Sequence, residues 1–149
     1  MKSLNIGIVD SNIHSSCSIV LPCNIYGATI GQNCFIGPFT EIQNDVFIGD
    51  NVRIQSHSFL CSGVSIGNSS FVGHGVMFIN DLFRDGAPAR GGKSKYKNTQ
   101  IGENVSIGSN ATILPVQICD NVVIGAGSVV TKDLMEAGIY AGNPVKKLK

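Results

Sequence analysis

An aliphatic or aromatic residue recurs at every sixth position through much of the first half of the chain. The series starts at Ile30 and reaches Phe78 without a missed step. A period of six differs from the period of two of a half-buried strand and from the 3.6 of a helix. Internal repetition is therefore the feature that most restricts the fold. The markers of this series are Ile30, Ile36, Ile42, Ile48, Ile54, Leu60, Ile66, Val72 and Phe78.

The same period appears on both sides of this series, with one step of five residues on each side. It includes three markers before Ile30, and it resumes at Ile101 after an interruption. Eighteen markers in total predict eighteen short strands. The additional markers are Ile13, Ile19, Ile25, Ile101, Ile107, Ile113, Ile118, Ile124 and Val130.

One hexad accommodates a short strand with two inward side chains, followed by a turn. The second inward side chain is the small or β-branched residue four positions after the marker, such as Cys34 or Val52. Three hexads form a triangular coil of about 18 residues, and coils stack at about 4.8 Å. Only stacking buries the apolar faces. The predicted fold is all-β, a parallel β-helix of about six triangular coils.

Asparagine recurs three residues after the marker, at Asn33, Asn51, Asn104 and Asn121. This residue tolerates the left-handed backbone that tight corners require. These positions are predicted turns.

The organisation predicted is a single domain over residues 1–149 with two segments outside the repeat. Residues 79–100 are glycine-rich and basic, and they form an extended loop that leaves the prism. A long insertion of this kind is more often functional than not. Residues 131–149 lose the repeat and are predicted to form a C-terminal cap over the open edge of the last coil.

Charge and composition exclude several classes of function. The net charge of +1 predicts no nucleic-acid or membrane partner. No signal-like or membrane-spanning apolar run is found, so a cytoplasmic protein is expected. Five cysteines without CxxC spacing are expected to be reduced and structural. With only three histidines and no cluster, no metal is expected.

The chain resembles the hexapeptide-repeat acyltransferases, which are trimeric left-handed β-helices acting on acetyl-CoA or a related thioester. The resemblance covers nearly the whole chain, and it is strongest in "IGENVSIGSNATILPVQICDNVVIGAGSVVTKD" followed by "AGNPVKK". It implies a left-handed helix, a homotrimer, and acetyl-CoA in a groove between prisms. By this resemblance the pantetheine is lined by Ser109, Ala126, Thr131 and Lys132, and the adenosine phosphates lie near Pro144 and Lys146. The tail lysines fit phosphate binding, or equally a solvated basic tail.

Many members of this family place a catalytic histidine at the start of the loop, where this chain has Asn80 and Asp81. This departure resembles enzymes that acetylate nucleotide-linked 3-amino sugars for surface polysaccharides. The segments "EIQNDVFIGDNVRIQSHSF", "GVMFIND" and "KYKNT" carry that resemblance. The nucleotide sugar, linked to dTDP or UDP, is therefore the expected partner.

An amine that attacks a thioester needs alignment and oxyanion donors but no protein nucleophile. Asn80 is a candidate to orient the amine with its amide, or it is a turn residue. His74 is the candidate base, because an outward histidine with a pKa near 6.5 accepts protons at cellular pH. The alternatives are a histidine that packs against another subunit, and the coenzyme thiolate as the proton acceptor.

Four further residues are candidates for substrate binding. His57 lies one coil before the His74 corner, where it contacts substrate or simply forms the corner. Asp81 is placed to fix an imidazole or the sugar, or it is a solvated carboxylate. Arg90 and Tyr96 can hold a nucleotide diphosphate and stack on its base, although a basic loop alone has the same composition.

The function expected is acetyl transfer from acetyl-CoA to the amino group of a nucleotide-linked amino sugar. One alternative is O-acetylation of a sugar or serine-like hydroxyl, which would depend severely on a histidine base. The other is a non-catalytic β-helix scaffold, which would not bind coenzyme A.

Overall fold

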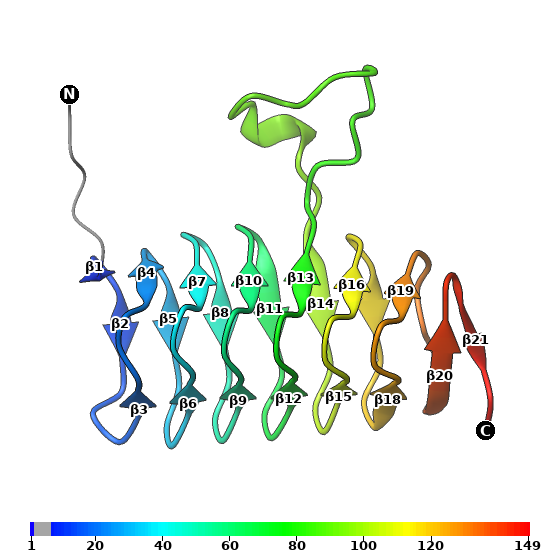
Figure 1. Cartoon of the computed structure of the whole chain (residues 1–149), viewed down its shortest axis with the longest axis horizontal. Coiled ribbons are helices and arrows are strands. Elements are labelled where there is room, and N and C mark those ends of the chain that lie inside the picture. Colours follow the sequence, from blue (N-terminus) through cyan, green and yellow to red (C-terminus); the bar gives the residue numbers. More distant parts are fainter. Residues whose placement is uncertain (2–6) are drawn as a thin grey trace.

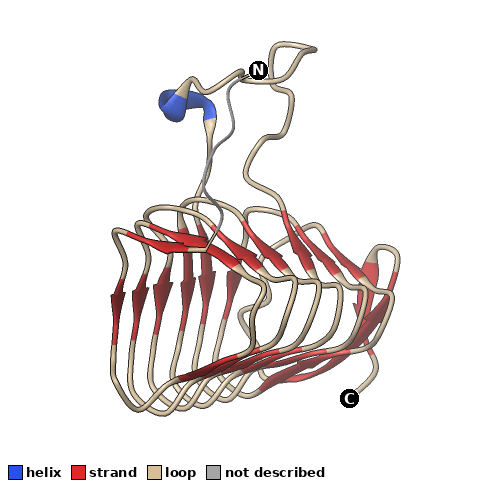
Figure 2. Ribbon diagram, turned by 60° about the vertical axis from the view of Figure 1, so that its left-hand side comes forward, coloured by secondary structure: helices blue, strands red, loops and turns tan. Residues whose placement is uncertain are grey.

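The chain winds into a three-walled prism of short strands in the computed structural model, which describes residue 1 and residues 7–149 (Figures 1 and 2). Three sheets, here called A, B and C, form the walls. Sheet A consists of β1 (Ile8–Val9), β4 (Asn24–Tyr26), β7 (Glu41–Ile42), β10 (Phe59–Leu60), β13 (Met77–Phe78), β16 (Thr112–Ile113) and β19 (Val129–Val130). Sheet B consists of β2 (Asn12–Ile13), β5 (Thr29–Ile30), β8 (Phe47–Ile48), β11 (Val64–Ile66), β14 (Thr99–Ile101) and β17 (Gln117–Ile118). Sheet C consists of β3 (Ser18–Ile19), β6 (Phe35–Ile36), β9 (Arg53–Ile54), β12 (Phe71–Val72), β15 (Ser106–Ile107), β18 (Val122–Ile124), β20 (Gly138–Gly142) and β21 (Val145–Lys147).

Strand pairing confirms the predicted left-handed parallel β-helix. Ile48 pairs with Ile30 on one side and with Ile66 on the other, so successive coils are 18 residues apart. Ile25 pairs with Ile42, 17 residues later, because this coil contains the step of five. The eighteen predicted strands correspond to β2 through β19. Strands β1, β20 and β21 were not predicted, because they contain no hexad marker.

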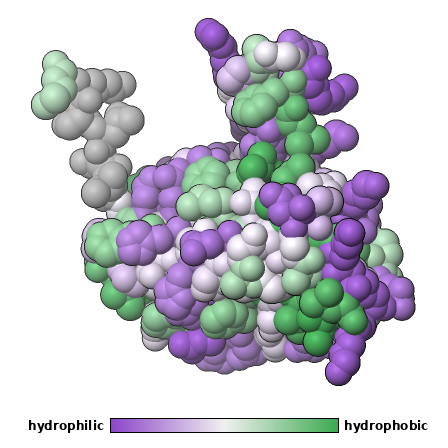
Figure 3. All heavy atoms as spheres, turned by 45° about the vertical axis from the view of Figure 1, so that its right-hand side comes forward, coloured by the Kyte–Doolittle hydropathy of each residue, from purple (hydrophilic) through white to green (hydrophobic). Residues whose placement is uncertain are grey.

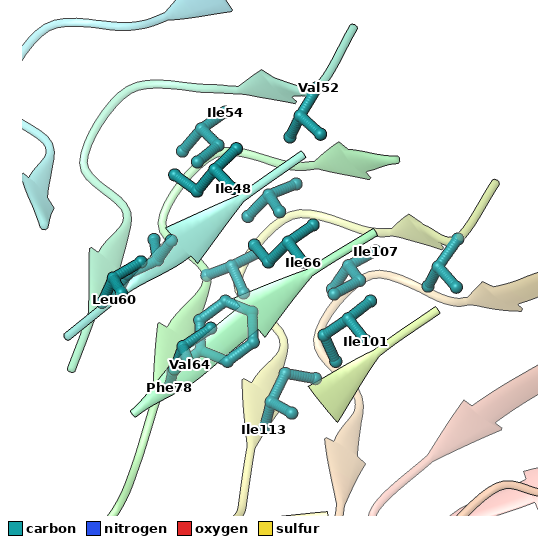
Figure 4. Close-up of a cluster of buried hydrophobic side chains, with 14 of the residues drawn as sticks. Ile48, Val52, Ile54, Leu60, Val64, Ile66, Phe78, Ile101, Ile107 and Ile113 are labelled. Carbon is teal, nitrogen blue, oxygen red and sulfur yellow. The ribbon is translucent and has the colours of Figure 1, made fainter. Parts of the chain in front are cut away.

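The core is a stack of marker side chains along the axis of the prism (Figure 4). Ile48, Ile66 and Phe78 have no exposed surface. The second inward position is also buried, as at Val52 and Val64. These layers exclude water, and the apolar area they bury drives the coils together.

Left-handed turns lie where the sequence predicted them. The φ angles are 54° at Asn33, 58° at Asn51, 53° at Asn104 and 60° at Asn121. Each turn directs the chain from one wall to the next.

Glycine follows many markers because adjacent coils approach closely there. A Cβ atom on Gly37 would lie 2.6 Å from the amide nitrogen of Ser56. A Cβ atom on Gly73 would lie 2.7 Å from the amide nitrogen of Ser109. Carbon and nitrogen cannot pack at these distances, so these positions exclude other residues.

A ladder of side chains satisfies backbone groups along the turns from sheet B to sheet C. The amide nitrogen of Gln32 donates to Oδ1 of Asp50 over 2.7 Å, and that of Asp50 donates to Oδ1 of Asn68 over 2.8 Å. The amide of Glu103 donates to Oδ1 of Asp120 over 2.8 Å. Each coil thus supplies acceptors for N–H groups that strand pairing leaves free.

The segment after β19 extends two of the walls by another coil. Leu134 forms a parallel bridge with Ile118 of sheet B, and Tyr140 is in register with Ile124 of sheet C. The chain then turns back, and β21 pairs antiparallel with β20. This hairpin lies at the C-terminal end of the prism (Figure 1).

The interruption of the repeat is a loop that projects from the prism between β13 and β14 (Figures 1 and 2). Its only regular element is a 3₁₀ turn, η1 (Lys93–Lys95). The described part of the chain has no helix long and apolar enough to cross a membrane.

Candidate active site

The turns from sheet C to sheet A, here called the C/A corner, carry three of the predicted site residues in one column. These turns comprise residues 20–23, 37–40, 55–58, 73–76, 108–111 and 125–128. The carbonyl of His74 accepts a hydrogen bond from the Asn110 amide over 2.8 Å, and that of Ser109 accepts one from Gly127 over 2.8 Å. His74, Ser109 and Ala126 therefore occupy equivalent positions in successive coils, with steps of about 4.8 Å.

The side chain of His74 is exposed at this corner. Among the described residues, its imidazole has no hydrogen-bond partner, so both ring nitrogens are accessible to a ligand. The backbone requires glycine on both sides of His74. A Cβ atom on Gly73 would collide with the Ser109 amide, and Gly75 has a left-handed φ of 66°. Their small size also leaves the imidazole uncrowded within its own coil.

A groove of about 310 Å³ lies beside the C-terminal hairpin. Its walls include Thr131, Lys132, Pro144 and Lys146, which are four of the six predicted cofactor-binding residues. The amide of Gly142 donates to Oγ of Ser128 over 3.1 Å, which ties the hairpin to the C/A corner. The two lysines make this end of the groove suitable for phosphate groups.

Asn80 lies at the opposite edge of sheet A, on the turn that leads to sheet B. Its Nδ2 donates to the carbonyl oxygen and to the Oγ of Ser62, each over 3.1 Å. Its own carbonyl accepts from the Lys97 amide over 3.1 Å. Asn80 thus joins both ends of the loop to the preceding coil, and its Oδ1 remains available as an acceptor.

Asp81 organises the interior of the loop. Its Oδ1 accepts from the Phe83 amide over 3.0 Å, and its Oδ2 accepts from the Ala89 amide over 2.7 Å. Both carboxylate oxygens therefore bind backbone of the loop itself.

Arg90 and Tyr96 also lie in the loop. Arg90 is exposed, with a φ of 51°. The Tyr96 hydroxyl accepts from the Gly91 amide over 3.1 Å, and its ring lines a small cavity of about 120 Å³ together with Asp45 and Ser62. The loop projects above the body of the prism in Figure 3, and Phe83 on it is 58% exposed.

His57 lies at the C/A corner one coil before His74. Its ring stacks on Phe39, with centroids 4.9 Å apart and the planes tilted by 32°. Its amide donates to the Pro38 carbonyl over 3.1 Å.

The candidate residues thus form two groups on one prism. His57, His74, Ser109 and Ala126 lie on the C/A corner, whereas Asn80 and the loop residues lie beyond β13. Thr131 and Lys132 follow β19 on the turn from sheet A to sheet B, and Pro144 and Lys146 lie in the C-terminal hairpin. His74 precedes β13 and Asn80 follows it, so the two residues lie at opposite edges of sheet A. Sequence reasoning missed Ser62 and Phe39, since neither belongs to a recognisable motif.

No group of three or more histidine, cysteine, aspartate or glutamate side chains suited to a metal occurs in residues 7–149.

A left-handed prism of hexads with a groove at one corner defines the hexapeptide-repeat class of proteins. Residues 27–62 match the family described as bacterial transferase hexapeptide (six repeats). Residues 98–132 match the hexapeptide repeat of succinyl-transferase. These two matches lie in the two blocks of hexads on either side of the loop.

Known proteins share this architecture over different lengths. A bifunctional protein GlmU of Campylobacter concisus is 55% identical over 51 residues, which are 34% of this chain and 11% of that protein. The chain therefore spans about a tenth of this curated relative.

Two solved structures resemble the whole prism. AntD, an N-acyltransferase from Bacillus cereus solved as a point mutant with dTDP and coenzyme A, is 26% identical with a TM-score of 0.68. That match covers 97% of this chain and 83% of AntD. PerB from Caulobacter crescentus, solved with CoA and GDP-perosamine, has a TM-score of 0.69 at 21% identity. This match covers 93% of this chain and 57% of PerB, and at this identity it supports the fold alone.

Proposed function

We propose that the protein transfers an acetyl group from acetyl-CoA to the amino group of a nucleotide-linked amino sugar, a 3-amino sugar for surface polysaccharide. The observation that carries this proposal is the alignment of His74, Ser109 and Ala126 on one corner that leads to the C-terminal groove. AntD, which binds dTDP and coenzyme A, supports the same pairing of ligands. The compartment proposed for this reaction is the cytoplasm.

In this scheme the coenzyme follows the corner towards the tail. The pantetheine lies along Ser109 and Ala126, and Thr131 and Lys132 continue its path into the groove. Pro144 borders the adenosine, and Lys146 neutralises a phosphate. The thioester then ends near His74.

The chemistry requires one proton acceptor. The neutral amine attacks the thioester carbonyl, the C–S bond breaks, and the thiolate of coenzyme A leaves. His74 accepts the proton that the amine loses, and the imidazolium returns it to the thiolate. Amide and free thiol are the products.

A homotrimer explains the separation of the two groups of residues. The loop of one prism reaches the C/A corner of its neighbour, and the Oδ1 of Asn80 accepts an N–H of the sugar amine there. Asp81 keeps the loop in shape, while Arg90 and Tyr96 approach the nucleotide.

Thiol release from acetyl-CoA across UDP-, dTDP- and GDP-linked 3-amino and 4-amino sugars tests the proposal. Turnover of amines and none of the matching hydroxyl sugars is expected. Turnover of hydroxyl sugars instead would establish an O-acetyltransferase. Failure to bind coenzyme A by calorimetry would establish a scaffold.

Replacing His74 by glutamine tests its role as the base. The kcat is expected to fall by about 10²- to 10⁴-fold, with loss of the acidic limb of the pH profile. An unchanged pH profile would assign the proton to the coenzyme thiolate.

A further inference from the structure

Two residues with aromatic rings occupy corner positions that favour small or short polar residues. The φ angle is 59° at Phe39 and 61° at His57. Histidine is enriched among residues in this left-handed conformation, but the bulky phenylalanine is disfavoured there, and such outliers concentrate at functional sites. The equivalent left-handed positions elsewhere hold Asp10, Gly27, Asn33, Asp45, Asn51, Gly63, Ser69, Gly75, Asn104, Asn110, Asn121 and Gly127.

Burial does not explain the presence of phenylalanine at this turn. Phe39 is 58% exposed, so its ring contributes little to the core. The His57 ring covers the side of Phe39 that faces the next coil. A strained and exposed ring is better explained by a ligand than by stability.

A cavity of about 290 Å³ opens beside Phe39 towards the preceding coil. Pro22 and Cys23 line it together with the ring. Asn24 and Glu41 add polar groups at its edge. An aromatic face bordered by an amide and a carboxylate is suited to a nucleobase, which stacks on the ring and pairs along its edge.

The edge groups retain hydrogen-bonding capacity. Glu41 accepts from the Tyr26 hydroxyl over 3.3 Å and from Nε2 of Gln43 over 3.1 Å, both at Oε1. Its Oε2 and the Asn24 carboxamide have no side-chain partner among the described residues. Glu41 thus accepts an N–H of a base, and Asn24 both donates and accepts.

The position of this cavity relative to His74 fits a nucleotide sugar. The His57 amide bonds the Pro38 carbonyl, and the Gly75 amide bonds that of Ser56 over 3.0 Å, so Phe39 lies two coils from His74. Two coils correspond to about 10 Å along the corner. A ribose and two phosphates bridge such a gap, with the sugar at His74 and the coenzyme beyond it.

We infer that the Phe39 cavity binds the nucleobase of the acceptor. The inference rests on the proposed function and assigns to the C/A corner a role that the loop residue Tyr96 was predicted to have. Arg90 and Tyr96 from the loop of the neighbouring subunit then approach the diphosphate of the nucleotide rather than its base.

Replacing Phe39 by asparagine provides the test, because asparagine suits the left-handed turn and keeps the fold. The KM for the nucleotide sugar is expected to rise about 5- to 150-fold, the range for loss of one stacked base. The kcat and the KM for acetyl-CoA stay within about threefold, and thermal stability is unchanged or higher. Phe47→Asn is the matched control, since Phe47 is 54% exposed on sheet B, away from this cavity.

Calorimetry with free UDP, dTDP and GDP gives a second measurement that does not depend on turnover. Wild type and Phe47→Asn are expected to bind one of them, and Phe39→Asn to bind it at least fivefold more weakly. Equal binding by all three proteins, or binding of none, overturns the inference. A change in oligomeric state in Phe39→Asn also overturns it, because the ring would then contact a second copy. Acetylation of nucleotide sugars with an unchanged KM in Phe39→Asn would reject the cavity and leave the proposed function standing.

Discussion

Thr99 provides a quantitative test of the packing at the base of the loop. This threonine is 1% exposed and follows the loop directly, at the start of β14. Its Oγ1 is the one buried side-chain oxygen or nitrogen without a partner in the described residues. Val64 and Val116 occupy the equivalent inward position in the adjacent coils. Replacing Thr99 by valine therefore places three consecutive valines of similar shape in this column.

The magnitude follows from the unpaired hydroxyl. An unsatisfied buried polar group costs about 1–3 kcal/mol, so Thr99→Val should raise the free energy of unfolding by about 1 kcal/mol or more. For a chain of this size each kcal/mol shifts the Tm by about 2–4 °C. Differential scanning calorimetry and urea unfolding measure both quantities.

Thr40→Val is the matched control. The Thr40 Oγ1 donates to the Gly37 carbonyl over 2.8 Å in an equally buried position. Its loss should lower stability by about 1 kcal/mol. If Thr99→Val is destabilised as much as Thr40→Val, the Thr99 hydroxyl has a partner such as a buried water, and the reasoning fails.

Two further measurements probe the loop and the buried thiols. Asn80→Ala removes both hydrogen bonds to Ser62. Trypsin should then cleave within residues 79–98 severalfold faster, while the circular dichroism spectrum stays unchanged. Equal cleavage rates in the variant and the wild type would contradict the anchoring role of Asn80. Burial raises the pKa of Cys34 to about 11 and that of Cys61 to about 12, so both should resist iodoacetamide at pH 8 until unfolding. Unfolded thiols ionise near pH 9, so their stabilisation is complete below pH 9 and declines as pH rises towards 11 and 12. A flat profile of stability from pH 8 to 11, or rapid labelling of the native protein, would exclude this environment.

The repeat made most of the fold predictable. Each marker points inward because one strand and one turn together take six residues, so markers six apart occupy the same position in successive walls. Asn33 and Asn51 adopt the expected left-handed φ angles at the turns. The additional strands could not be predicted in the same way. Strand β20 pairs through its backbone, and its inward Tyr140 follows Ile124 after 16 residues, outside the hexad spacing.

The candidate site was predictable only in part. The column of His74, Ser109 and Ala126 follows from counting coils, and the structure places these residues on one corner. The partner of Asn80 is Ser62, 18 residues earlier, and such a contact depends on side-chain geometry that spacing does not specify. The stacking of Phe39 on His57 could not be predicted for the same reason. The sequence shows both aromatic residues, but it does not show that their rings touch.

Because every coil has the same height, distances along the C/A corner are whole multiples of the coil spacing. Removing 18 residues between Phe39 and His74, such as residues 43–60, would keep the register of the remaining coils, and it would bring the Phe39 cavity about 4.8 Å closer to His74. The length of molecule that fits along this edge is thus set by the number of coils, and a family built on it can change substrate size in whole steps.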